Sequence, residues 1–307
     1  MYLNLSLKVS LVLLIVLLSS GCEDSSQTTY SPSYSTKPLV DTKKSYIFGV
    51  HPLHNPKRLF EVYQPLMDYL NKNIDGVSFT LEASRNYPAY DEKLFSGHFD
   101  FSLPNPYQTV QSLSHGYKVF GKMGDDKNFR GIILVRKDSN INKVTDLKGK
   151  TVSYPAPTAL AATMMPQWYL HTHGIDINKD IKNSYVGSQE SSIMNVYLKK
   201  SSAASTWPPP WRAFIKERPE IAKEVEIKWE TTNLPNNGLV VKTGVDEKLV
   251  ENVSKLLFNL HNNKLGREIL KPMELSKFEK ANSETYDSVV KFLKKFESEV
   301  RDIRGEK

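Results

Sequence analysis

Cys22 is the residue whose position most directly predicts a chemical modification. It is the single cysteine among 307 residues, so no disulfide can form within the chain and no thiolate cluster can hold a metal. Lys8, the apolar stretch 9–18 and the small residues 19–21 precede it in that order. This order is typical of a secretory signal, and the stretch is shorter than the about 20 apolar residues that span a bilayer. We expect residues 1–21 to be a signal peptide, and the alternative is a plain signal with a chance cysteine.

The residues before Cys22 resemble the bacterial lipobox, in which the cysteine becomes the lipidated first residue. Ser19 stands where Leu is usual, and Leu18 lies one step away. Residues 22–45 combine this cysteine with a stretch rich in Ser, Thr and Pro, which cannot bury a core and is typical of a flexible tether. We therefore expect a folded part from Tyr46 onwards, held to a membrane of the cell envelope or periplasm through Cys22.

No other pattern supports catalysis, a metal or a cofactor. The chain contains no nucleophile elbow, no HExxH and no phosphate-cradling P-loop, which argues against an enzyme. His171 and His173 are two positions apart on a predicted helix, so they point in different directions and predict no metal site. The 41 Lys+Arg and 34 Asp+Glu give a net charge of +7, but no basic run interleaved with aromatics predicts nucleic-acid binding.

The elements that must position any site alternate between strands and helices. Amphipathic helical spacing predicts helices at 59–70, 90–95, from 104, 157–171, 189–198, 249–260 and 286–300. Apolar or alternating runs predict strands at 46–50, 77–81, 99–103, 131–135, 151–154, 184–186, 203–206, 225–229 and 238–242. This order predicts an α/β fold, and the polar stretch 138–150 is the expected passage into a second lobe.

Several segments, in their order and spacing, resemble the phosphonate/phosphite-type periplasmic substrate-binding proteins of ABC importers. The resemblance runs from about Tyr46 to Phe296, and its segments are 63–70, 97–101 with 105–107, 135–139, 146–150, 157–166, 187–190 and 234–237. It implies a two-lobed type II periplasmic-binding fold, each lobe a mixed sheet flanked by helices, with a ligand cleft between the lobes. Lobe 1 would comprise 46–136 and 235–307 and lobe 2 would comprise 137–234, with crossings near 135–140 and 231–237.

The resemblance also implies a ligand site, in which helix N-termini and backbone N–H groups hold an anionic head. The family's main anion loop falls on Thr158, Ala159 and Leu160, where only Thr158 keeps a hydroxyl. A family histidine is Gln189 here. The other positions that we expect to bind ligand are Tyr87, Asn105, Ser188 and Asn237. These departures suit a ligand that is less charged than the family's usual one, or shaped differently.

Three further residues have two interpretations each. Arg130, beside the Phe129 that replaces a family tyrosine, either pairs with an oxyanion or lies at the surface or hinge. Trp207, in Trp207-Pro-Pro-Pro-Trp211, either forms a cleft wall or packs on the second lobe, and a polyproline docking motif is a third interpretation. His51 either touches ligand or is satisfied by solvent or backbone.

The sequence therefore predicts a monomeric, lipid-anchored solute receptor without cofactor. It would capture a small, anionic, phosphonate- or phosphite-like solute and deliver it to an ABC permease. The alternatives are a sensory receptor that signals through a histidine kinase, and a receptor for a neutral or cationic solute.

Overall fold

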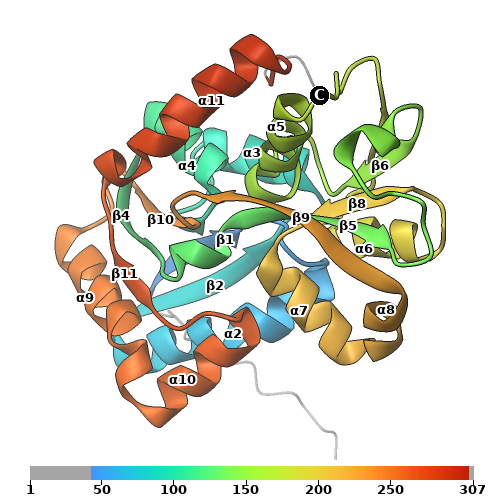
Figure 1. Cartoon of the computed structure of the whole chain (residues 1–307). Helices are drawn as coiled ribbons and strands as arrows, with labels where there is room; N and C mark the ends of the chain where they lie inside the picture. Colours follow the sequence, from blue (N-terminus) through green and yellow to red (C-terminus); the bar gives the residue numbers. More distant parts are fainter. Residues whose placement is uncertain (1–42, 304–307) are drawn as a thin grey trace, which may run out of the picture. The chain divides into compact units, whose positions relative to one another are not determined.

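The computed structural model describes residues 43–303, and the predicted signal, Cys22 and most of the predicted tether lie outside them. Two mixed sheets lie side by side in this part of the chain (Figure 1). The first sheet has the strand order β11-β4-β10-β3-β1-β2 and the second has the order β7-β6-β8-β5-β9. The predicted α/β class with two mixed sheets flanked by helices is therefore confirmed.

The first sheet forms lobe 1. Its strands are β1 (Lys44–Val50), β2 (Val77–Ala83), β3 (Phe101–Leu103), β4 (Tyr117–Met123), β10 (Gly238–Lys242) and β11 (Phe278–Lys280). Its helices are α2 (Pro56–Asn73), α3 (Tyr87–Phe95), α4 (Pro106–Ser112), α9 (Glu247–Phe258), α10 (Lys264–Leu270) and α11 (Asp287–Glu299). β1 pairs in parallel with β2 and β3, whereas β10 is antiparallel to β3 and β4.

The second sheet forms lobe 2. Its strands are β5 (Arg130–Arg136), β6 (Thr151–Tyr154), β7 (Lys182–Tyr185), β8 (Ala203–Thr206) and β9 (Val225–Asn233). Its helices are α5 (Met165–Thr172), α6 (Gln189–Tyr197), α7 (Pro208–Glu217) and α8 (Pro219–Glu224), with α5 on one face of the sheet and α6 to α8 on the other (Figure 1). β6 is parallel to β7 and β8, whereas β5 is antiparallel to β8 and β9.

The position of β5 differs from the predicted lobe boundary. Our boundary placed residues 46–136 in lobe 1, but β5 hydrogen-bonds only strands of the second sheet, so the chain crosses between β4 and β5, at 124–129. The second crossing lies between β9 and β10, at 234–237. The two crossings touch, because Leu234 N–H donates to the carbonyl of Phe129 at 3.1 Å and Asn236 N–H donates to the Asp126 carboxylate at 3.0 Å.

The end of the described chain also contacts lobe 2, although we assigned residues 235–307 to lobe 1. Arg301, just after α11, donates from Nε to Gln167 Oε1 at 2.9 Å and from Nη2 to the carbonyl of Pro157 at 2.7 Å. Asn178 of lobe 2 donates to the carbonyl of Val300 at 2.9 Å. The C-terminal segment therefore forms a third link between the lobes, next to the predicted anion loop.

Helix starts follow a recurring local pattern that places them after strands. Asn55, Asn86 and Asn105 each accept a hydrogen bond from the backbone of the helix they precede, and each is followed within two residues by proline. Proline suits the first helical turn because its missing N–H would have no partner there. The caps fix where α2, α3 and α4 begin, at the ends of strands that face the other lobe.

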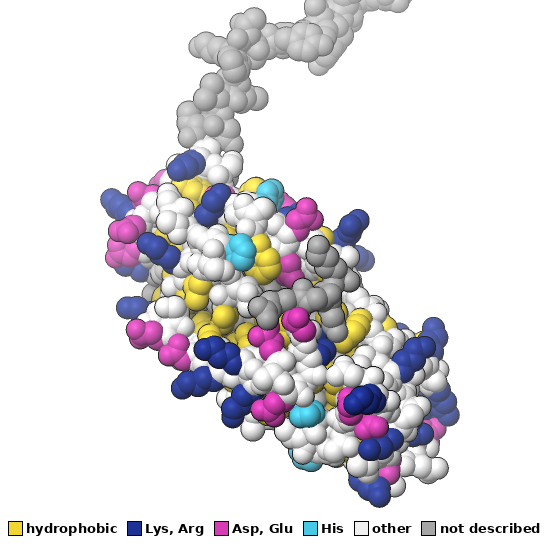
Figure 2. Space-filling view, turned by 90° about the horizontal axis from the view of Figure 1, so that it is seen from above, with side chains coloured by type: hydrophobic (Ala, Val, Ile, Leu, Met, Phe, Trp, Pro, Cys, Tyr) yellow, Lys and Arg dark blue, Asp and Glu magenta, His cyan; other side chains and the backbone are white. Residues whose placement is uncertain are grey.

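The surface carries charges of both signs. Figure 2 shows Lys and Arg side chains interspersed with Asp and Glu over one face of the described part. Among the helices within residues 43–303, none combines the length and the apolar character that crossing a membrane requires.

Candidate functional site in the interlobe cleft

A small inner cavity of ≈10 Å³ lies between the two lobes. It brings together eight of the eleven residues predicted to bind ligand: His51, Tyr87, Asn105, Ala159, Leu160, Gln189, Trp207 and Asn237. Phe129, Ala161 and Ala162 complete its lining. No Lys, Arg, Asp or Glu side chain lines it, so any charge recognition here must come from backbone and helix dipoles.

Several helices begin at this inner cavity. Tyr87 is the first residue of α3, Gln189 is the first residue of α6, and Trp207 directly precedes α7. Leu160 begins a π-helical turn, Leu160–Met164, that continues into α5. Each helix N-terminus carries about half a positive charge. The cavity is therefore electropositive without containing a cationic side chain, and this favours an anion.

The turn that begins at Leu160 offers the clearest set of backbone donors. Its first hydrogen bonds are donated by Thr163 and Met164 to the carbonyl of Ala159, at 2.8 and 3.3 Å. The N–H groups of Leu160, Ala161 and Ala162 precede these bonds, and all three residues are buried and line the cavity. These N–H groups can hold the oxygens of an anion although the hydroxyls of the family loop are absent.

His51 lies at the end of β1 and is neutral in this setting. Its Nδ1 is 2.8 Å from the carbonyl oxygen of Leu103, which can only accept, so Nδ1 carries the hydrogen. Burial, with a smaller effect of nearby His54, lowers the pKa of His51 to about 4, although the hydrogen bond to Leu103 opposes the shift. His51 therefore adds no positive charge to the inner cavity at neutral pH.

Asn237 and Gln189 are fully buried polar residues on opposite lobes. Asn237 Nδ2 donates to the sulfur of Met123 at 3.3 Å, while Asn237 Oδ1 has no hydrogen-bond partner within the described part of the chain. Gln189 Oε1 accepts from the hydroxyl of Thr206 at 2.7 Å. Gln189 is thus held by Thr206 of its own lobe and also interacts with Tyr87 of lobe 1, whereas Asn237 leaves one acceptor without a partner among the described residues.

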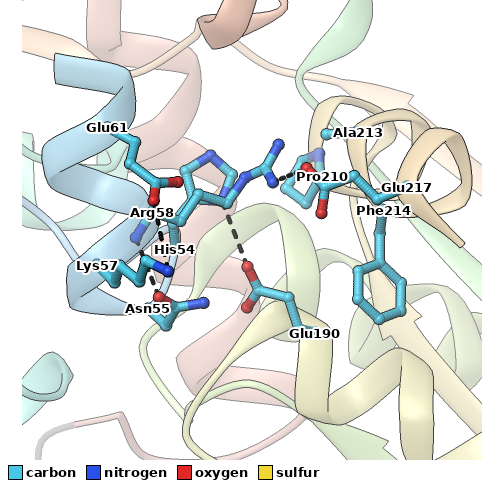
Figure 3. A pocket seen from close by; sticks show the side chains of 10 residues that line it. All are labelled: His54, Asn55, Lys57, Arg58, Glu61, Glu190, Pro210, Ala213, Phe214 and Glu217. Carbon is cyan, nitrogen blue, oxygen red and sulfur yellow. Dashed lines mark hydrogen bonds and ion pairs between the residues drawn. The ribbon is translucent and has the colours of Figure 1, made fainter.

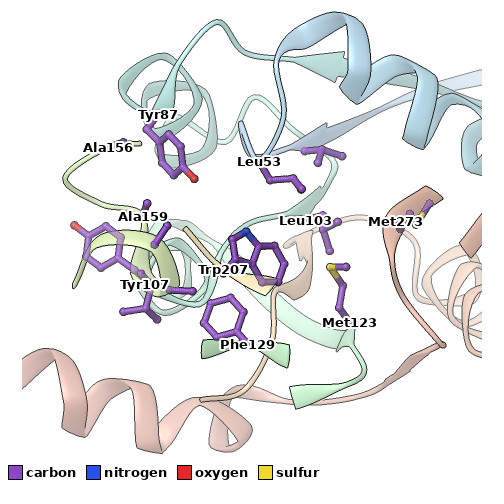
Figure 4. Packing of buried hydrophobic residues seen from close by; sticks show 14 of the residues in the cluster. Leu53, Tyr87, Leu103, Tyr107, Met123, Phe129, Ala156, Ala159, Trp207 and Met273 are labelled. Carbon is purple, nitrogen blue, oxygen red and sulfur yellow. The ribbon is translucent and has the colours of Figure 1, made fainter. Parts of the chain in front are cut away.

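Trp207 and Phe129 form the aromatic wall of the cavity, with ring centroids 5.6 Å apart (Figure 4). Trp207 is 3% exposed and belongs to the same buried cluster as Phe129. The three prolines after it do not form an extended docking segment, because Pro208–Pro210 are the first turn of α7, where proline is tolerated. Trp211 packs in the core of lobe 2 instead of the cavity.

Three predicted residues do not line the inner cavity. Arg130 pairs with Glu230 on β9, with Nε 2.8 Å from the carboxylate. Thr158 contributes its carbonyl, which accepts from Asn105 Nδ2 at 3.1 Å across the cleft. Ser188 caps α6 by accepting from the N–H of Ser191. Asn105 and Ser188 thus have structural roles that their positions at helix starts explain.

A second cavity, of ≈270 Å³, forms what we call the cleft mouth, between the start of α2, the start of α6 and α7 (Figure 3). His54 and Arg58 of lobe 1 reach across it to Glu190 and Glu217 of lobe 2, and His54 Nδ1 lies 3.5 Å from Glu190 Oε1. Burial raises the pKa of Glu190, but its hydrogen bonds and the charge of His54 outweigh this effect and leave the pKa below its usual value. The cleft mouth thus holds charged pairs that link the lobes.

The sequence prediction missed Phe129, Ala161 and Ala162 as site residues, together with the charged residues of the cleft mouth. The available signal was positional, because Ala161 and Ala162 continue the helix start at Leu160 and Phe129 is the last residue of the first crossing. Within residues 43–303, no group of His, Cys, Asp or Glu side chains is arranged to hold a metal ion.

Solved structures with this fold include several binding proteins. PhnD1 from Prochlorococcus marinus in complex with methylphosphonate superposes with a TM-score of 0.75 at 21% identity, covering 82% of this chain and 98% of that one. The binding component of a Pseudomonas aeruginosa ABC phosphonate transporter gives a TM-score of 0.74 at 15% identity, covering 82% and 86%. A Xanthomonas citri protein bound to ATP gives 0.67 at 15% identity, covering 84% and 100%.

Sequence comparison assigns the family. A curated relative, the probable ABC transporter phosphite-binding protein PhnD1 of Prochlorococcus marinus, is 22% identical over 184 residues, which is 56% of this chain and 62% of that protein. The chain thus spans about three fifths of the length of that curated relative. The family model for periplasmic phosphonate substrate-binding proteins of ABC transporters matches residues 48–286. The chain therefore belongs to this family of substrate-binding proteins, whose members are receptors and not enzymes.

Proposed function

We propose that this protein captures a small oxyanion in the inner cavity and delivers it to an ABC permease. The observation that carries this proposal is the convergence of helix N-termini on a buried cavity without charged side chains. The N–H groups of Leu160–Ala162 would bind the charged oxygens, and the Trp207 wall would contact an apolar substituent. A relative that carries methylphosphonate supports a ligand of this chemistry.

The size of the cavity favours a small ligand and a moving cleft. A cavity of ≈10 Å³ holds about one water molecule, so a tetrahedral oxyanion enters only when the lobes stand further apart than here. The two crossings at 124–129 and 234–237 are short and adjacent, as a hinge between two rigid lobes requires. Closure over a phosphite- or methylphosphonate-sized head fits this geometry better than closure over a bulky ligand.

The export and anchoring of the chain are part of the same proposal. Residues 1–21 would be removed and Cys22 lipidated, which would leave 22–43 as a tether outside the cytoplasm, two residues shorter than predicted because β1 begins at Lys44. Expression of the full chain and of Cys22→Ser tests this, because only the unchanged chain should partition into detergent and carry a lipid mass. A chain that is water-soluble in both forms would leave a plain secretory signal.

A thermal-shift panel tests the ligand. The mature chain with Cys22→Ser would be heated with phosphite, methylphosphonate, phosphate, sulfonates, carboxylates and amines, because a ligand that binds only the folded state raises the melting temperature. We expect a shift with a small phosphorus oxyanion. A shift with only a neutral or cationic solute would overturn the proposal in favour of a ligand set by the Trp207 wall. A genetic neighbourhood with a histidine kinase instead of a permease would favour a sensory receptor.

A further inference from the structure

The two lobes present opposite hydrogen-bonding groups to the inner cavity. Lobe 2 presents the donors, the N–H groups of Leu160, Ala161 and Ala162. Lobe 1 presents two acceptors, His51 Nε2 and Asn237 Oδ1, whereas its Asn105 amide donates to the carbonyl of Thr158 and its Tyr87 hydroxyl interacts with Gln189. An anion without a hydroxyl group would bind these two acceptors poorly, because a charged oxygen repels an acceptor lone pair.

The acceptor character of His51 follows from its hydrogen bond to Leu103. Since Nδ1 carries the hydrogen, Nε2 of the neutral ring carries a lone pair, and the structure gives Nε2 no hydrogen-bond partner within residues 43–303. The groups packed around the ring are the edges of Tyr87 and Tyr90 on α3 and the side chain of His54 on the same loop. The Tyr90 hydroxyl is already bonded to Ser102 at 2.6 Å.

Asn237 adds a second acceptor with independent geometry. The residue is fully buried, lines the cavity and leaves Oδ1 without a partner among the described residues. Its amide orientation is set by Met123, because a sulfur accepts from Nδ2 and would be a poor neighbour for Oδ1. A buried acceptor without a donor is costly, so a ligand that supplies the donor gains affinity over one that does not.

We propose that the site selects the singly protonated form of its oxyanion, with lobe 2 holding the charged oxygens and His51 Nε2 accepting the hydrogen bond from the ligand hydroxyl. Asn237 Oδ1 disfavours a second charged oxygen on the lobe 1 side. This inference rests on the proposed function. It assigns the ligand class as a monoanion that carries an O–H group, such as hydrogen methylphosphonate or hydrogen phosphite, and excludes the dianion and oxyanions that lack a donor.

Calorimetric titration with methylphosphonate and methanesulfonate tests the proposal. Methanesulfonate is also tetrahedral, carries the same single charge and a methyl group, and has no hydroxyl. We expect the mature chain with Cys22→Ser to bind methanesulfonate about a hundredfold more weakly or worse, as sites built for a hydroxyl reject analogues without one. Methylphosphonate affinity should fall about tenfold per pH unit above the second ionisation of the ligand, because only the protonated form binds.

Variants test whether His51 sets the ligand preference and whether the pH dependence of binding comes from the ligand or from a group of the protein. His51→Phe keeps a ring but removes the acceptor, so the preference for methylphosphonate should be lost. The control His98→Phe should keep it, because His98 is exposed and pairs with Glu82 on β2. Asp91 on α3, bonded to Gln108 at 2.6 Å, is a carboxyl that also titrates near neutral pH, so the pH profile is repeated with Asp91→Asn and should persist.

The outcomes distinguish the inference from the proposed function. Equal affinity for the two ligands, or tighter binding of methylphosphonate as pH rises, overturns the inference while oxyanion binding stands. No binding of either ligand, or of phosphite, at any pH overturns the proposed function and the inference with it. The wild-type comparison of the two ligands decides the question even where His51→Phe fails to fold.

Discussion

The inner cavity and the cleft mouth lie within the same cleft but are lined by different kinds of residues. The inner cavity is lined by backbone, amides and aromatic rings, without a Lys, Arg, Asp or Glu side chain. The cleft mouth is lined largely by charged residues, which meet across the lobes as His54–Glu190 and Arg58–Glu217. We therefore expect the fixed dipoles of the inner cavity to determine ligand selectivity, and the charged pairs of the mouth to be replaceable by water and salt.

This contrast predicts that inner residues contribute more to stability than mouth residues. The largest expected effect is that of Trp207→Ala, because the ring is 3% exposed and packs against Phe129. We expect the free energy of unfolding, measured by urea denaturation, to fall by about 3–5 kcal/mol. Trp229→Ala, at a half-buried position on β9, is the matched control and should cost clearly less. Equal losses would mean that Trp207 is no special part of the cavity wall.

Two carboxyl groups near the cleft sharpen the contrast through opposite pKa shifts. Burial raises the pKa of Asp91 on α3 to about 7, although a hydrogen bond from Gln108 opposes the shift. Because the folded pKa exceeds the usual 3.8, the folded state binds the proton more tightly, and stability rises as pH falls from above 7 towards 4. Asp91→Asn should therefore stabilise the protein above pH 7 by roughly 2–4 kcal/mol, an advantage that disappears on acidification.

Glu190 at the cleft mouth provides the comparison for Asp91. Its pKa lies below the usual 4.5, so its stabilising contribution is present above that pH and is lost as pH falls through the lowered value. Glu190→Gln should thus destabilise at neutral pH and match the wild type in acid, the reverse of Asp91→Asn. Denaturant titrations of both variants across pH measure the change in the free energy of unfolding. If it varied with pH in the same direction for both variants, the opposite pKa shifts would be contradicted.

Gly131 tests how firmly the inner donors are positioned. A Cβ at this position would lie 2.6 Å from the carbonyl oxygen of Ala161 and 2.6 Å from Pro166 Cγ. Gly131→Ala should cost about 1–3 kcal/mol of stability. By displacing the donor turn it should also weaken oxyanion binding roughly tenfold or more. Gly121→Ala, whose Cβ would instead meet Phe258 in lobe 1, should cost stability without this loss of affinity.

Much of this region was predictable because its signals are local. The strands are short apolar or alternating runs, and Asn or Ser precedes α2, α3, α4, α6 and α10. The inner cavity itself was located through the resemblance to the family, residue by residue. The helix α7 was not recognised because three prolines suggest a rigid loop, although they also fit a first helical turn. β4 was missed because it carries Lys122, whose buried ammonium is neutralised by Asp126 and Glu279.

The remaining differences depend on pairings between distant residues. The apolar run of β5 fits either lobe, and only its antiparallel partners β8 and β9 assign it to lobe 2. Arg130 is a plausible anion ligand by sequence. Its partner Glu230 lies a hundred positions away, and no local pattern predicts this pair. The mouth pairs share this property, since Arg58 and Glu217 are 159 residues apart.

The smallest expected effect concerns those mouth pairs and tests whether they contribute to closure. Arg58→Gln removes the pair with Glu217, and exposed pairs of this kind contribute about 0–1 kcal/mol, so ligand affinity should change less than about fivefold. The change should shrink at high salt, which screens exposed charges. Lys57→Gln is the matched control, because Lys57 pairs with Glu61 on the same helix and links no lobes. If Arg58→Gln weakened binding strongly and independently of salt, Arg58 would contact the ligand, and the charged mouth would share in the selectivity that we assign to the inner cavity.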